Sequence, residues 1–155
     1  MALIMIIIGS DHGGFKLKGE LKNFLEEKGK TVIDCGVFNE ESVDYPDIAQ
    51  LVCNRLFEKK ASFAVLICGT GIGISIAANK IKGIRAALIC NEFSAKMASE
   101  HNNANVVCFG GRTTNFDSAA KMLDVFMTSK FQGGRHQARV DKIMSIGECN
   151  NEKTR

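Results

Sequence analysis

The fold is decided by the stretch Phe63-Ala64-Val65-Leu66-Ile67-Cys68-Gly69-Thr70-Gly71-Ile72-Gly73, in which an apolar run passes directly into a glycine-rich turn. The unbroken apolar run predicts a buried strand, and the closely spaced glycines predict a tight turn after it. The residues from Ile74 to Lys80 then predict a helix. Cys68 is therefore expected where a strand gives way to a helix N-terminus, a place where backbone N–H groups converge on an anion.

The same alternation of apolar runs and amphipathic stretches continues on both sides of this segment. Five runs predict strands, at residues 3–8, 31–35, 63–68, 86–90 and 105–109. Helices are predicted between and after them, near residues 17–25, from Pro46 onward, from the glycine turn to about Gly83, over 93–100, around 119–127 and from about Arg135. Such strands, rich in Ile, Val and Leu, are typical of a parallel sheet covered on both faces. The predicted fold is α/β: a three-layer, doubly wound, Rossmann-like, five-stranded parallel sheet with helices on both faces.

Length and composition predict one domain over residues 1–147, followed by a polar C-terminal tail at 148–155. A chain of 155 residues buries a sufficient core without disulfides or metal. A net charge of +3 does not imply nucleic-acid binding. The apolar start, Met1 to Ile8, lacks a basic region and a cleavage site and is too short to span a bilayer. We therefore expect a cytoplasmic protein without a nucleic-acid or membrane partner.

The six cysteines are spread along the chain and form no C-x-x-C pair. This spacing supports neither a zinc site nor a dithiol redox motif. Reduced thiols in a cytosolic compartment and no bound metal are the expectation.

Ligands of an open parallel sheet bind beyond the carboxyl ends of its strands. In this sequence the first strand is followed by Asp11 and His12, the third by Cys68, and the fifth by Arg112. A carboxylate, an imidazole, a thiol and a guanidinium are thus predicted at one edge, as in a site for a polar small molecule. Cys68 alone would also suit a buried packing role, but its position at a helix N-terminus favours a reactive thiolate.

The motifs of several phosphate-handling enzymes are absent. There is no G-x-x-x-x-G-K-[ST] sequence, and Ile74 stands where the C-x₅-R motif of cysteine phosphatases needs arginine. Gly69 to Gly73 read G-x-G-x-G instead of the dinucleotide G-x-G-x-x-G. A nucleotide site stays open as an alternative, because Glu92 follows this turn at a suitable spacing.

Four further polar residues lie outside that edge. His101 and Asn102 fall between the fourth helix and the fifth strand, where a solvated loop is the simpler interpretation. Arg135 and Arg139 are one helical turn apart, and two like charges on one face repel unless an anion lies between them. With Arg112 they would suit a phosphate group, whose oxygens match guanidinium forks; an ordinary basic surface is the alternative.

Taken together, the motifs of the chain resemble type B ribose-5-phosphate isomerase, a family that also holds the galactose-6-phosphate and allose-6-phosphate isomerases. The resemblance covers nearly all of residues 4–146. It is carried by Gly9-Ser10-Asp11-His12-Gly13-Gly14-Phe15, Asp44-Tyr45-Pro46, Ile67 to Lys80, Gly83-Ile84-Arg85-Ala86, His101-Asn102 and Gly133-Gly134-Arg135-His136.

The resemblance implies a metal-free aldose–ketose isomerase that interconverts ribose 5-phosphate and ribulose 5-phosphate through a cis-enediol. Cys68 would move the proton between C2 and C1, and His101 would assist opening of the furanose ring. The sugar would be held by Asp11, His12, Gly69, Thr70, Gly71, Ile72, Gly73 and Asn102, and the phosphate by Arg112, Arg135 and Arg139. No cofactor is implied.

The position of His101 does not suit a site built by one chain. It precedes the fifth strand and so falls toward the amino edge of the sheet, opposite Cys68 and Asp11. We expect a homodimer with shared active sites, as the resemblance implies, and a tetramer stays open. Two other functions also stay open: a hexose-6-phosphate isomerase of the same family, and a sugar-phosphate- or nucleotide-binding module without catalysis.

Overall fold

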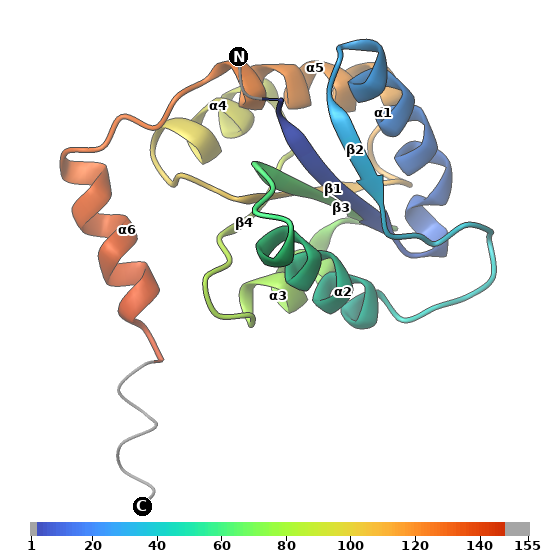
Figure 1. Ribbon diagram of the computed structural model, residues 1–155, viewed down its shortest axis with the longest axis horizontal. Coiled ribbons are helices and arrows are strands. Elements are labelled where there is room, and N and C mark those ends of the chain that lie inside the picture. The colour runs from blue at the N-terminus through green and yellow to red at the C-terminus, as the bar shows by residue number, and fades with distance from the viewer. Residues whose placement is uncertain (1–2, 148–155) are drawn as a thin grey trace, which may run out of the picture.

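A five-stranded, fully parallel sheet forms the middle layer of the protein, seen in a computed structural model that describes residues 3–147 (Figure 1). Its strands are β1 (Met5–Ser10), β2 (Thr31–Asp34), β3 (Phe63–Cys68), β4 (Ala86–Leu88) and β5 (Val106–Gly110), in the order β2-β1-β3-β5-β4. The predicted tail at 148–155 lies outside the described residues.

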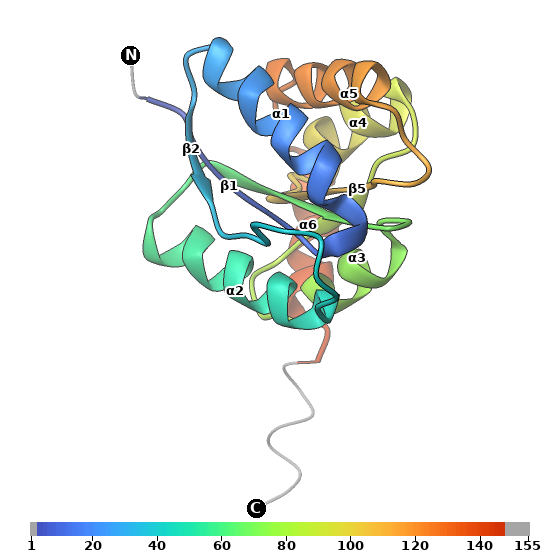
Figure 2. The same cartoon turned by 90° about the vertical axis from the view of Figure 1, so that its right-hand side faces the viewer.

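Helices cover both faces of this sheet, which confirms the predicted fold class. One face carries α1 (Phe15–Glu27), α4 (Glu92–Glu100) and α5 (Phe116–Thr128), and the other carries α2 (Tyr45–Glu58) and α3 (Ile72–Asn79) (Figure 2). A short 3-10 helix, η1 (His12–Gly14), precedes α1. The last helix, α6 (Arg135–Ser145), stands apart from both helix layers (Figure 1).

Two apolar clusters form the core, one on each face of the sheet. Along β1, Ile6 and Ile8 pack with the α1 side, and Ile7 packs with the α2 side. Successive side chains of a strand point to opposite faces, so a strand buried on both faces must be apolar at every position. This explains why the predicted strands show no alternation.

Strand ends differ from the prediction at the edge that matters for function. β1 continues to Ser10, because Gly9 and Ser10 pair with Leu66 and Ile67 of β3. Asp11 therefore follows β1 directly. The second helix begins at Tyr45, one residue before Pro46. Pairing between strands that are distant in the sequence sets the ends of the strands. The local sequence pattern carries no information about this pairing.

A buried ion pair joins α1 to the end of β2. The Lys18 ammonium group lies 2.7 Å from both carboxylate oxygens of Asp34, and Lys18 is only 2% exposed. One of those oxygens also accepts a hydrogen bond from the Gly36 amide at 2.9 Å. The Gly36 carbonyl in turn accepts the Ser10 amide at 2.8 Å. This pair thus ties the loop after β2 to the end of β1.

We predict that Asp34→Ala destabilises the protein by about 3–5 kcal/mol, because it leaves the Lys18 charge buried and unpaired. Urea unfolding of the purified variant measures this loss. The exposed pair between Lys28 and Asp124, also 2.7 Å apart, is a matched control. Asp124→Ala should cost about 1 kcal/mol or less. Equal losses in the two variants would contradict the prediction.

Candidate active site

Three chain segments meet beyond the carboxyl ends of β1, β3 and β5, as the sequence predicts. The Asp11 amide donates to the Ile67 carbonyl at 3.1 Å, which joins the first segment to the third strand. The amides of Gly111 and Arg112 donate to the carbonyls of Cys68 and Gly69 at 2.8 and 2.9 Å. Backbone hydrogen bonds therefore bring Asp11, Cys68 and Arg112 to one place.

Glycines allow these segments to approach so closely. A Cβ at Gly13 would stand 3.0 Å from the Gly69 nitrogen, and one at Gly111 would collide with the Gly13 carbonyl oxygen. The Arg112 guanidinium lies over Gly69, with Nη1 3.1 Å from where a Cβ would be. A side chain at Gly111 would push the loops apart, and one at Gly13 would crowd the backbone of Gly69.

Cys68 is buried, with 3% of its surface exposed, and its thiol is held by the turn that follows it. The Gly71 amide donates to Cys68 Sγ at 3.2 Å. Gly71 has a φ of +76°, a left-handed conformation that glycine adopts without strain. The turn thus gives the sulfur an N–H donor and fixes its position at the start of the helix.

The other turn residues line the entrance to the helix. The Ile72 amide donates to Thr70 Oγ1 at 3.2 Å, and both residues are exposed. Since helix geometry leaves the first amides of α3 without an intrahelical acceptor, those of Gly73 and Ile74 remain for a bound oxygen. The turn therefore divides its donors between the sulfur and a ligand, whereas the sequence alone suggested one cradle for a single anion.

Asp11 and His12 are both oriented by the backbone. Asp11 is 5% exposed, and its Oδ1 accepts the Gly14 amide at 3.2 Å as the cap of η1. His12 Nδ1 accepts the Val43 amide at 3.3 Å. This bond places the proton of a neutral imidazole on Nε2, which leaves His12 as a donor to a ligand.

Tyr45 also lies at this edge, and the sequence did not identify it as a site residue. A Cβ at Gly73 would collide with the Tyr45 ring, so ring and turn are in close contact. The Asp44-Tyr45-Pro46 motif drew attention to the segment. Its distance in sequence from the glycine turn concealed the contact.

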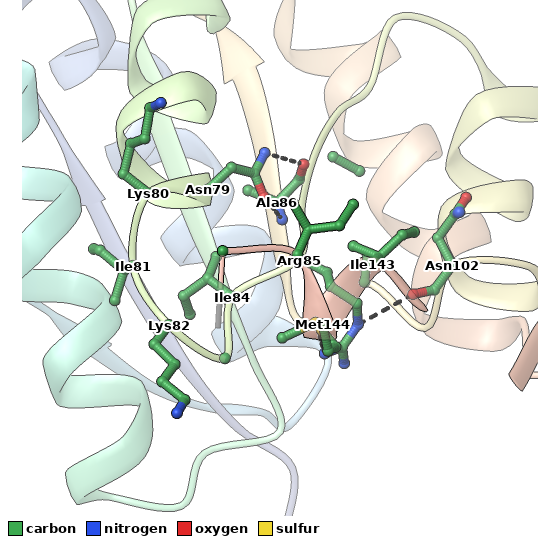
Figure 3. A pocket seen from close by; sticks show the side chains of 15 residues that line it. Asn79, Lys80, Ile81, Lys82, Ile84, Arg85, Ala86, Asn102, Ile143 and Met144 are labelled. Atoms are coloured by element: carbon green, nitrogen blue, oxygen red, sulfur yellow. Dashed lines mark hydrogen bonds between the residues drawn. The ribbon is translucent and has the colours of Figure 1, made fainter. Parts of the chain in front are cut away.

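His101 and Asn102 lie away from this edge, at the end of α4 and toward the amino ends of the strands. The His101 ring stacks on that of His136, with centroids 4.0 Å apart and planes inclined by 11°. Asn102 lies beside Arg85 near α6 (Figure 3). The stack also places Arg135 and Arg139, on α6, near His101. One chain therefore does not bring Arg112 together with Arg135 and Arg139.

Within residues 3–147, no group of three or more His, Cys, Asp or Glu side chains is arranged to hold a metal ion. Among the helices of the same residues, none combines the length and apolar character needed to cross a membrane. That the protein works without a metal stays a prediction.

Fold and site together define an enzyme of the doubly wound α/β class, with a thiol, a carboxylate and an imidazole at the carboxyl edge. The family model described as ribose/galactose isomerase matches residues 6–143. The chain belongs to this family.

The chain is similar in sequence to named relatives over nearly its whole length. It is 42% identical to ribose-5-phosphate isomerase B of Escherichia coli, over 94% of this chain and 98% of that protein. A putative sugar phosphate isomerase of Rickettsia conorii is 46% identical, with 89% and 96% covered. The structure of ribose-5-phosphate isomerase B from Clostridium thermocellum matches with a TM-score of 0.92 at 46% identity, covering 95% of this chain and 99% of that chain.

The stacked histidines predict a pH-dependent stability. Burial lowers the pKa of His136, and the positive charges of His101, Arg135 and Arg139 lower it further. Below the ordinary value of about 6.5, the unfolded chain then binds a proton that the folded chain resists. The free energy of unfolding should therefore fall as the pH drops below that value. Above it, the titration of His136 should no longer change the free energy of unfolding.

Urea unfolding at neutral and mildly acidic pH, compared between wild type and His136→Gln, measures this effect. The variant should lose less stability on acidification. An identical pH dependence in the two proteins would show that His136 is not responsible.

Proposed function

We propose that this protein is an aldose–ketose isomerase that interconverts D-ribose 5-phosphate and D-ribulose 5-phosphate. The observation that carries the proposal is the Cys68 thiol, held by the Gly71 amide at the edge where Asp11 and Arg112 also lie. The family and the relatives named for ribose 5-phosphate support the same reaction.

Cys68 is the proposed proton carrier. Its thiolate takes the proton from C2 of the open-chain aldose, and the electron pair forms the C1–C2 double bond of a cis-enediol. The C1 carbonyl oxygen becomes the enediolate oxygen and gains the proton that the C2 hydroxyl loses, the Cys68 thiol gives a proton to C1, and C2 becomes the ketone carbon, so the step needs no oxidant or reductant. General base catalysis of this kind contributes about 10²–10⁴-fold.

The backbone donors around the thiol hold the charge that develops. The amides at the start of α3, Gly73 among them, lie at the positive end of the helix dipole. Donors preorganised toward a developing oxyanion are worth about 3–4 kcal/mol each. Asp11 and the Nε2 proton of His12 bind the sugar hydroxyls, and the Arg112 guanidinium binds the phosphate.

Ring opening requires the second group of residues, and we assign it to a partner subunit. His101, Asn102, Arg135 and Arg139 lie around the end of α4 and the start of α6, at the opposite edge from Cys68. A twofold dimer in which this region faces the partner's Cys68 completes two sites at once. His101 then assists ring opening, Asn102 binds the sugar, and the two arginines bind the phosphate.

A groove beside α6 supports the choice of a second copy as partner. It has a volume of about 1000 Å³ and lies between α6 and the connection from α3 to β4. Ile143 and Ile146 line it and are 46% and 80% exposed. Apolar side chains so exposed beside half of a site suit an interface. A cytoplasmic location fits the free thiols of the described cysteines.

The hexose-6-phosphate isomerases of the family and a silent binding module are less well supported. The relatives from Escherichia coli and Clostridium thermocellum are named for ribose 5-phosphate, and a positioned thiol is not needed for binding alone.

The direct test is an isomerisation assay with ribose 5-phosphate, with and without a chelator. We expect turnover that the chelator does not change, and a higher kcat/KM for ribose 5-phosphate than for allose 6-phosphate. Cys68→Ala should lower kcat by about 10²–10⁴-fold, because it removes the base. A preference for the hexose phosphate, or full activity of the variant, would refute the proposal.

The shared site is tested by mixing two inactive proteins. In a hybrid of Cys68→Ala and His101→Ala subunits, one site carries both changes and the other carries neither. Random pairing should then restore about a quarter of the wild-type activity per subunit, as twofold symmetry requires. If each chain builds its own site, the mixture stays inactive.

A further inference from the structure

Arg85 lies just before β4, and its side chain reaches Asn102, which directly follows His101 (Figure 3). Its Nε donates to the carbonyls of Asn102 and Asn103, at 3.2 and 2.9 Å, and its Nη2 donates to the Asn103 carbonyl at 2.7 Å. One guanidinium thus holds two successive carbonyl groups directly after His101.

Those carbonyls lie one and two residues past the end of a helix. His101 is the C-cap of α4, and Asn103 has a φ of +45°, the left-handed conformation that often terminates helices. The end of a helix carries partial negative charge. Arg85 gives the two carbonyls three hydrogen bonds from two of its nitrogens and places a positive charge near the end of α4. The path of the chain through Asn102 therefore depends on this side chain.

The backbone of Arg85 is itself fixed. Its amide donates to Asn105 Oδ1 at 2.8 Å, and its carbonyl accepts the Asn105 amide at 3.1 Å. The Asn105 side chain also donates to the Gly83 carbonyl at 2.9 Å. Arg85 is thus anchored to the residue that leads into β5, and the sheet fixes the place from which its side chain extends.

The same side chain reaches α6. Arg85 Nη1 lies 3.5 Å from Met144 Sδ, within hydrogen-bond range of sulfur. At its other end, α6 is tied to the corner by the stack of His136 on His101. Burial lowers the pKa of Arg85, yet a guanidinium stays charged in proteins. Arg85 therefore contacts both the segment after α4, which follows His101, and α6, which carries His136.

We propose that Arg85 is a positioning residue that sets the orientation of His101 and Asn102 and their distance from α6. Its effect on turnover rests on the proposed function, whereas its effect on the geometry of the corner does not. A lysine in its place keeps the charge but loses the planar fork that spans two carbonyls. Arg85→Lys is therefore the informative change.

The first measurement is independent of catalysis. The chain contains three histidines, His12, His101 and His136, so the imidazole C–H signals in an NMR spectrum of the intact protein are few. In Arg85→Lys we expect the signals of His101 and His136 to shift and that of His12, at the opposite edge, to stay. Signals of all three that coincide with wild type would overturn the proposal. Arg85→Gln serves as a second variant if Arg85→Lys does not fold.

The second measurement separates the two halves of the reaction. Ribulose 5-phosphate has no furanose form, so exchange of its C1 hydrogen with heavy water needs the Cys68 step but not ring opening. At saturating substrate, Arg85→Lys should keep this exchange within about twofold of wild type and lower net turnover of ribose 5-phosphate by about tenfold, a part of what an acid–base group supplies.

The matched control is Arg55→Lys, at a half-buried arginine of α2 paired with Glu58, which should leave both rates unchanged. An equal loss of exchange and turnover in Arg85→Lys, or no loss of either, would overturn the positioning role. A wild-type protein without isomerase activity would refute the proposed function instead, and the NMR result would still decide the role of Arg85.

Discussion

Backbone hydrogen bonds between the ends of β1, β3 and β5 are the constraint on which the site depends. Asp11 is tied to Ile67, and the segment after β5 is tied to Cys68 and Gly69, all through main-chain atoms. Side chains at Gly13 or Gly111 would separate these segments. The thiol, the carboxylate and the guanidinium are therefore positioned by a sheet whose strands are buried on both faces, which is the most rigid part of such a fold.

The two edges of the sheet are built differently. At the carboxyl edge, loops hold one another by main-chain bonds, and glycines dominate. At the amino edge, side-chain contacts fix the segments relative to one another. Arg85 binds the residues after α4, Asn105 binds Arg85, and His136 stacks on His101. In the dimer that we propose, this region meets the partner subunit, and fixing its contact residues before association avoids the free-energy cost of ordering them on binding. The network around Arg85 supplies that order.

Residue types and motifs predicted which side chains gather at the carboxyl edge of the sheet, but not the contacts that these side chains make. The thiol at the strand end and the pair Asp11 and His12 followed from the topology of a parallel sheet. The contact of Tyr45 with Gly73 and the bond from Gly71 to the Cys68 sulfur did not, because each depends on how a loop closes in three dimensions. Arg85 stood in a quoted motif without a role, since its partners lie 17 and 18 positions away.

The sequence by itself determined the fold class and the order of helices and strands, because hydrophobic periodicity and turn glycines act over a few residues. It indicated the family through the resemblance of its motifs. Only the tertiary structure decided where β1 and β5 end, which amide of the turn after Cys68 binds the sulfur, and which contacts hold the residues at each edge. The strand ends depend on pairing between strands such as β1 and β3, which lie more than fifty residues apart. The stack of His136 on His101 is the clearest case of such a contact, because the two rings are far apart in the sequence and only 4.0 Å apart in the fold.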